Sequence, residues 1–110
     1  ERIGALVAKA RRNLQALKVG NVRLKHGDGG SDLGEDLVVD AIIVAAGATH
    51  LPVSLQKHLK PGGRIVVPLA SRDEGERGVQ RLTVFESTPS GLRETALDAV
   101  RFVPLLAGRA

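Results

Sequence analysis

Two nearly unbroken apolar stretches constrain the fold more than any other feature of this sequence. The first covers residues 38–46, with Asp40 as its single charge, and the second covers residues 64–69. Strands that are covered on both faces, as in parallel sheets, have this composition. Neither stretch approaches the roughly 20 apolar residues that cross a bilayer, so we expect no transmembrane helix and no membrane partner.

The residues around these stretches predict an alternation of helices and strands. Apolar residues at three- and four-residue steps predict an amphipathic helix over residues 2–17, with Gly20 as a left-handed cap. The next expected elements are a strand at 22–25, a polar loop or helical turn at 31–36, and a helix at 51–59 that is stopped by a turn at 60–63. An exposed loop at 71–78, a strand at 79–87, a turn at 88–91 and a strand at 96–103 follow, and the last two strands are expected to pair antiparallel.

This order predicts an α/β fold, in which strands and helices alternate around an open, mainly parallel sheet. Ligands of such sheets bind outside the carboxyl ends of the strands. Three loops are expected there, at residues 27–30, 45–50 and 69–71. We see no domain boundary, so residues 1–110 are expected to belong to a single domain.

Composition excludes several classes of function. The net charge of +4 comes from scattered basic residues, and the only aromatic residues are Phe85 and Phe102, so we expect no nucleic-acid partner. Cysteine is absent, which excludes disulfides and thiolate metal sites and fits a cytoplasmic protein. No signal peptide is visible, and because the chain lacks methionine and opens on Glu1, we expect a piece of a longer protein.

Few residues suggest chemistry by themselves. The turn formed by Gly27, Asp28 and Gly29 could let a ligand approach the backbone, or could be a turn closed by its own aspartate. Glu1 could grip ribose hydroxyls from the tip of a strand, or could be a plain surface charge.

The usual catalytic and metal-binding groups have no supporting context. The histidines lack metal-ligand spacing and the serines lack a glycine elbow, so we expect no metal and no serine nucleophile; these residues are His26, His50, His58, Ser54, Ser71 and Ser87. On the residues alone, the chain is a small-molecule or nucleotide-binding α/β domain.

Several segments, taken together, are more specific than any one of them. In order they are Glu1-Arg2-Ile3, Asn21-Val22, His26-Gly27-Asp28-Gly29, Asp40-Ala41-Ile42-Ile43-Val44, Leu51-Pro52, residues 59–68 (LKPGGRIVVP), Gln80-Arg81-Leu82 and residues 100–105 (VRFVPL). Their order and spacing resemble the second half of protein-L-isoaspartate O-methyltransferases over essentially the whole chain.

The resemblance implies part of the Rossmann-like sheet of S-adenosylmethionine-dependent methyltransferases, with an antiparallel strand pair at its C-terminal end. It assigns cofactor contacts to Glu1, Arg2, Asp28, Gly29, Ala45 and Ala46, and a substrate contact to Val103. The acid at position 1 would accept hydrogen bonds from the cofactor ribose, and the aspartate turn would contact the adenine. The alanine pair would lie beside the methyl donor, and the valine backbone would hold the isoaspartyl residue.

The implied reaction is methylation of L-isoaspartyl residues in damaged proteins, a repair function that needs no catalytic acid or base. Two departures from the family pattern concern specificity: Ala45 stands where the family often has threonine, and a charged segment follows Pro68-Leu69-Ala70 where the family favours Pro-Val-Gly. A related methyltransferase with another acceptor, or a non-catalytic module derived from a methyltransferase half, are the alternatives.

The resemblance also implies that the central strand of the sheet and the glycine-rich cofactor loop precede this chain. Strand edges left unpaired in this way are prone to pair with other chains. We therefore expect the 110-residue chain to be inactive alone, and to need the missing half, a strand-swapped copy or another completing partner.

Overall fold

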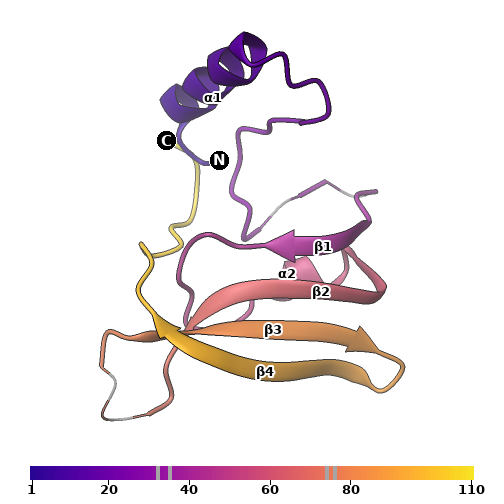
Figure 1. The fold of residues 1–110 in the computed structure, drawn as a ribbon, viewed down its shortest axis with the longest axis vertical. Coiled ribbons are helices and arrows are strands. Elements are labelled where there is room, and N and C mark those ends of the chain that lie inside the picture. Colours follow the sequence, from indigo (N-terminus) through magenta and orange to yellow (C-terminus); the bar gives the residue numbers. More distant parts are fainter. Residues whose placement is uncertain (32, 35, 74, 76) are drawn as a thin grey trace. The chain divides into compact units, whose positions relative to one another are not determined.

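The computed structural model describes residues 1–31, 33–34, 36–73, 75 and 77–110. They form two compact units, Glu1–Leu33 with Leu106–Ala110, and Gly34–Leu105, which we describe separately. The first unit holds helix α1 (Gly4–Ala16). The second holds β1 (Val39–Ile43), α2 (Val53–Gln56), β2 (Leu59–Ala70), β3 (Gln80–Thr88) and β4 (Gly91–Val100) (Figure 1).

The second unit is built on one four-stranded sheet with the order β1-β2-β3-β4. β1 and β2 are parallel, whereas β2–β3 and β3–β4 are antiparallel, which confirms the expected C-terminal pair. A mainly parallel sheet is therefore wrong for the strands described here. The connections after β2 and β3 are too short for the crossover of a dozen or more residues that parallel neighbours require.

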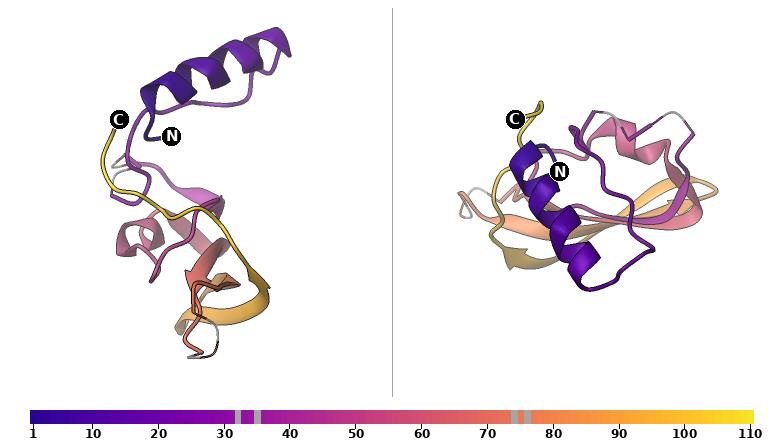
Figure 2. Two further views of the ribbon diagram at one scale, coloured as in Figure 1. Left: turned by 90° about the vertical axis from the view of Figure 1, so that its left-hand side faces the viewer. Right: turned by 90° about the horizontal axis from the view of Figure 1, so that it is seen from above.

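The core of this unit lies along alternate residues of β2. Ile65 and Val67 are fully buried, and Phe85 of β3 pairs with Ile65 in register. Leu55 of α2 covers the same core, and α2 lies against one face of the sheet (Figure 2). α2 is shorter than the predicted helix over 51–59, because the chain enters β2 at Leu59 and pairs there with Val39.

β1 is more exposed than its composition predicts. Ile43 is 80% exposed, and Val38 just before the strand is 54% exposed, so the expectation of a strand covered on both faces is wrong in this chain. The physical reason is its position: β1 forms one edge of the sheet, and α2, with four residues, is the only described helix in this unit.

β2 passes through residues 60–63, where a turn was expected. The register shifts between the pairs Val39–Leu59 and Ala41–Arg64, so the extra residues form a bulge rather than a reversal. Gly62 adopts φ +80°, a conformation that glycine takes without strain. The glycines thus bend β2 locally without ending it.

Helix α1 confirms the predicted helix, but it ends earlier than its predicted cap. Val19 N–H bonds Leu14 O and Lys18 N–H bonds Gln15 O, which is the Schellman pattern, and the left-handed residue is Lys18 (φ 56°). The prediction of Gly20 as the cap is therefore wrong. The helix ends at Ala16, so the left-handed position falls at Lys18, two residues before Gly20.

The segment at 22–25 is not a strand. It lacks a described strand beside it, and Val22 is 49% exposed. The loops expected at 31–36 and 71–78 are described only in part, because residues 32, 35, 74 and 76 lie outside the described residues. The rest of 71–78 is exposed or half-buried, as expected.

The β3–β4 hairpin confirms the predicted turn at 88–91, where the Thr88 hydroxyl donates to Gly91 O at 2.7 Å. β4 covers Gly91–Val100, whereas the predicted strand covers 96–103. After Val100 the chain leaves β3, and Val103 bonds Gly47 instead. Neither helix in the described part of the chain has the length and apolar character of a membrane span.

Candidate functional site

In the first unit, the backbone brings Glu1 beside the Gly27–Asp28 turn. The nitrogen of Glu1 donates to Lys25 O at 3.1 Å, and Gly27 N–H donates to Glu1 O at 3.0 Å. The Glu1 carboxylate is exposed and accepts the Ile3 N–H at 2.9 Å through Oε1, at the start of α1. Two predicted cofactor contacts, Glu1 and Asp28, thus belong to one local structure.

The Asp28 carboxylate holds the chain's own backbone. Its Oδ1 accepts the Gly30 N–H at 2.9 Å, and its Oδ2 accepts the Gly108 N–H at 3.0 Å. These bonds, the one from Gly108 first, lower the pKa of Asp28 from its usual value. The bond from Gly30 closes the turn with its own aspartate, which is one of the two alternatives that the sequence allowed. A carboxylate offers about four acceptor positions, so two such bonds still leave room for a ligand donor.

Residues 106–110 are tied by several further bonds to the start of the chain and to His26. Arg2 Nε–H donates to Gly108 O at 3.2 Å, Ala110 N–H donates to Arg2 O at 2.7 Å, and Gly4 N–H donates to Ala110 O at 2.7 Å. His26 Nε2 lies 2.9 Å from Arg2 O and 3.2 Å from Ala110 O, so this nitrogen carries the proton. Arg2 and His26 therefore have structural partners in this unit.

In the second unit, a narrow strip of backbone joins two other sets of predicted residues. Gly47 N–H donates to Val103 O at 2.7 Å, and Leu105 N–H donates to Gly47 O at 2.8 Å. On its other side, Ala48 bridges Leu69 at the end of β2. Ala45 and Ala46, the predicted cofactor residues, directly precede Gly47 in the chain. Gly47 in turn bonds Val103, the predicted substrate residue.

This strip also confirms that two of the three expected ligand loops meet at the carboxyl ends of parallel strands. Ala70 N–H donates to Ala48 O at 2.9 Å, which joins the loop at 45–50 to the loop at 69–71. The third loop, at 27–30, belongs to the other compact unit.

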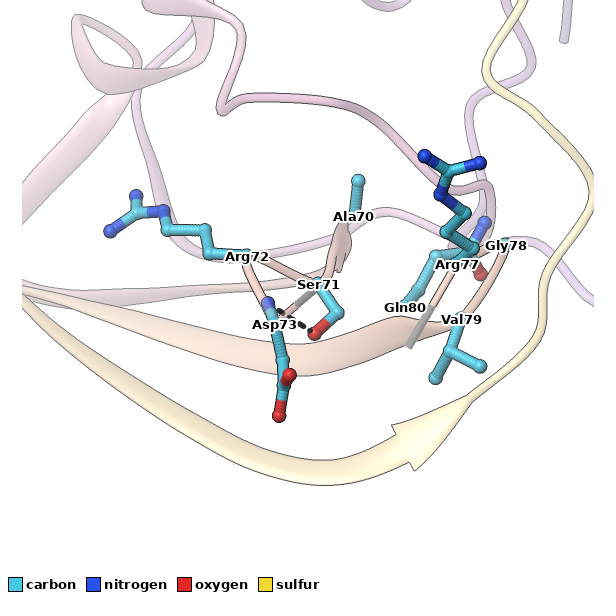
Figure 3. Close-up of a pocket in the computed structure, with 8 residues that line it drawn as sticks. All are labelled: Ala70, Ser71, Arg72, Asp73, Arg77, Gly78, Val79 and Gln80. Carbon is cyan, nitrogen blue, oxygen red and sulfur yellow. Dashed lines mark hydrogen bonds between the residues drawn. The ribbon is translucent and has the colours of Figure 1, made fainter. Parts of the chain in front are cut away.

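A hollow opens next to this strip, where β2 ends and β3 begins. It has a volume of about 610 Å³, and its lining consists of Ala70, Ser71, Arg72, Asp73, Arg77, Gly78, Val79 and Gln80 (Figure 3). Arg72 also pairs with Glu94 of β4 at 3.6 Å. The hollow is walled by the charged segment that departs from the family pattern.

The histidines have structural partners rather than a shared site. His58 is buried, and its Nδ1 lies 2.7 Å from Leu37 O. His50 lies in the loop after β1 and contacts the Thr49 hydroxyl at 3.0 Å. Among the residues that the structure describes, no group of three or more histidine, aspartate or glutamate side chains could hold a metal ion.

Sequence reasoning missed Gly47, Gln80 and Gly108, each of which makes a contact that links distant segments. Gly47 could have been noticed as a glycine within a run of alanines, a pattern typical of close backbone approach. Gln80 stands in a segment that carries the resemblance, but neither it nor Gly108 has a local signal for its contact, since the partners lie 22 and 80 positions away.

Comparison with known proteins gives a consistent result. A family model described as protein-L-isoaspartate(D-aspartate) O-methyltransferase matches residues 1–110. Protein-L-isoaspartate O-methyltransferase of Dechloromonas aromatica is 50% identical over 98% of this chain and 47% of its own length. The same enzyme of Chromobacterium violaceum is 46% identical over 99% of this chain and 46% of its own length.

A solved structure agrees. A Plasmodium falciparum chain, described as a protein-L-isoaspartate O-methyltransferase in complex with S-adenosyl-L-homocysteine, has a TM-score of 0.78 and 26% identity; the match covers 96% of this chain and 50% of that one. The sheet described above is thus part of a Rossmann-like methyltransferase fold. The chain spans about half the length of the curated relatives it matches, and along all of that span it belongs to the protein-L-isoaspartate(D-aspartate) O-methyltransferase family.

Proposed function

We propose that this chain is the C-terminal part of a single S-adenosyl-L-methionine-dependent methyltransferase domain that methylates L-isoaspartyl residues in damaged proteins. The observation that carries the proposal is the strip at Gly47, where the loop of Ala45 and Ala46 meets the backbone of Val103. A methyl donor held by that loop would lie beside an acceptor held by Val103.

The residues present fit the cofactor by their chemistry. Glu1 and Asp28 are two carboxylates of one local structure, and carboxylates accept hydrogen bonds from ribose hydroxyls and from the amino group of adenine. In the proposal, Glu1 and Arg2 flank the ribose and Asp28 and Gly29 meet the base. Alanine side chains at 45 and 46 leave space for the donor's methyl group.

The proposed reaction asks the protein for position rather than for proton transfer. When bound, the cofactor supplies a methyl group on a sulfonium, which is an electrophile. An isoaspartyl carboxylate, with a pKa near 4, is already ionised at pH 7 and needs no general base. The chain's residues then hold the carboxylate in line with the methyl–sulfur bond, a contribution of about 7–11 kcal/mol in well-oriented systems.

The experiment is a methyl-transfer assay with the complete gene product. Methyl-labelled S-adenosyl-L-methionine is incubated with two peptides that differ only in carrying isoaspartate or aspartate at one position. We expect label in the isoaspartyl peptide alone, and its release by mild base, as for a carboxyl methyl ester. Equal labelling of both peptides, or of neither, contradicts the proposal and favours another acceptor or a non-catalytic module.

The proposal extends to partners and location. The partners are isoaspartyl-containing peptides and proteins, and the 110-residue chain requires a completing partner or the rest of the domain, since the relatives are about twice as long. A cytoplasmic location is supported by the absence of cysteine.

A further inference from the structure

The side chain of Gln80 binds both backbone groups of one residue in another part of the second unit. Its Nε2–H donates to Phe102 O at 3.2 Å, and its Oε1 accepts the Phe102 N–H at 2.6 Å. Phe102 follows the end of β4 and lies outside any strand. The carboxamide supplies the donor and the acceptor that a neighbouring strand would otherwise supply to its backbone.

Gln80 is well placed for this task because its own backbone is fixed on both sides. It is the first residue of β3 and pairs with Ala70 of β2 and with Val100 of β4. Phe102 is outside any strand and is 41% exposed, so little apolar burial holds it in place. The position of the chain just before Val103 therefore depends on the Gln80 carboxamide.

Gly47 completes the arrangement from the other side. Its backbone bonds Val103 O and Leu105 N, while a Cβ on Gly47 would lie 2.1 Å from Gln80 Nε2 and 2.6 Å from Gln80 Cδ. Only glycine at this position lets the Gln80 carboxamide reach Phe102 while the Gly47 backbone holds Val103 and Leu105.

We propose that Gln80 and Gly47 form a clamp that positions residues 102–105 for the acceptor peptide, so that both are positioning residues for substrate binding. The inference rests on the proposed function, because it takes Val103 as a substrate contact. Neither residue touches the reacting atoms. The clamp sets where the Val103 backbone lies relative to the loop of Ala45 and Ala46, and Gln80 also borders the hollow in Figure 3.

The first test is Gln80→Leu in the complete gene product, which keeps the side chain's size and removes both bonds. We expect KM for the isoaspartyl peptide to rise about tenfold, the scale of one or two hydrogen bonds, while KM for S-adenosyl-L-methionine changes less than about twofold. Gln56→Leu, on the exposed face of α2, makes the same chemical change and should leave both constants as they are.

The second test uses the contact between the two residues. Gly47→Ala alone should raise the peptide KM as Gln80→Leu does, because the new methyl group displaces the carboxamide. Gln80→Ala removes the obstacle, so adding Gly47→Ala to Gln80→Ala should cost less than about twofold more. Two independent effects that multiply in the double variant would overturn the clamp.

Hydrogen exchange gives a readout that does not depend on catalysis. The Phe102 amide should exchange at least about tenfold faster in Gln80→Leu and in Gly47→Ala than in the unchanged protein. If Gln80→Leu fails to fold, Gly47→Ala carries both measurements.

The outcomes separate the two proposals. An unchanged protein that does not methylate the isoaspartyl peptide contradicts the proposed function, whatever the exchange rates. An active protein whose variants lose thermal stability, but keep their peptide KM and Phe102 exchange, contradicts the clamp alone.

Discussion

The Asp28 carboxylate holds local structure and, in the proposed function, also accepts a hydrogen bond from the cofactor. It binds the N–H groups of Gly30 and Gly108, and these bonds lower its pKa. A pKa that is lower in the folded state stabilises the fold above the unfolded value of about 3.9, and this stabilisation is lost as the pH falls through the folded value.

Asp28→Asn should therefore lower the free energy of unfolding at pH 7, because an amide has one acceptor oxygen where the carboxylate has two. The stability of the variant should also depend less on pH below about 4 than that of the unchanged protein. Urea unfolding between pH 3 and pH 7 measures both effects. Asp98→Asn on the exposed face of β4 is the control, and identical acid profiles for the two variants would contradict the prediction.

Individual residues were predictable where their partners are local. The Gly27-Asp28-Gly29 turn was visible in the sequence because glycine and aspartate together favour such a turn. The second bond of Asp28, to Gly108, and the clamp between Gln80 and Phe102 were not visible, because both join residues that only the folded chain brings together. The roles of Glu1, Ala45 and Val103 in ligand binding stay predictions.

At the scale of elements, the bulge in β2 depends on the absence of a side chain at Gly63. A Cβ there would lie 2.7 Å from Asp40 O of β1 and 2.6 Å from Leu59 Cδ1, and Gly63 is buried. The backbone oxygen cannot move aside without disturbing the parallel pairing of β1 with β2.

Gly63→Ala should therefore lower the free energy of unfolding by about 1–3 kcal/mol, the usual range for overpacking. Gly20→Ala, where no atom lies within 4 Å of the added Cβ, should stay within about 0.5 kcal/mol of the unchanged protein. Thermal or urea unfolding of the two variants compares them directly, and equal losses would show that Gly63 has no special role.

Elements were predicted better in kind than in extent. The apolar run of β2 reflects a burial pattern that the local sequence reveals, whereas the periodicity of α1 predicted the helix although Val7 is its one buried residue. The ends of α2 and β4 were wrong because tertiary pairing sets them: Leu59 joins β1, and the chain leaves β3 after Val100. Composition alone missed the exposure of β1, because it reports what a strand needs and not which neighbours are present, whereas the family resemblance did imply unpaired strand edges.

At the scale of the whole molecule, the chain spans about half the length of the family members that it matches. β1 forms an open edge with Ile43 80% exposed, and the curated relatives are about twice as long. The 110-residue chain alone should bind S-adenosyl-L-methionine too weakly for isothermal titration to detect at micromolar concentrations, and it should not methylate the isoaspartyl peptide.

Micromolar one-to-one binding by the 110-residue chain would contradict this expectation. The complete gene product, titrated under the same conditions, is the positive control. Addition of the remaining residues as a separate chain should restore binding if pairing at the β1 edge is what the short chain lacks.

The bonds between Gly47 and residues 103–105 join positions that are far apart along the chain. Contacts of this kind close large loops and tend to form late in folding. The link between the loop at 45–50 and residues 103–105 would then close only after the β3–β4 hairpin, whose strands are neighbours along the chain, has formed.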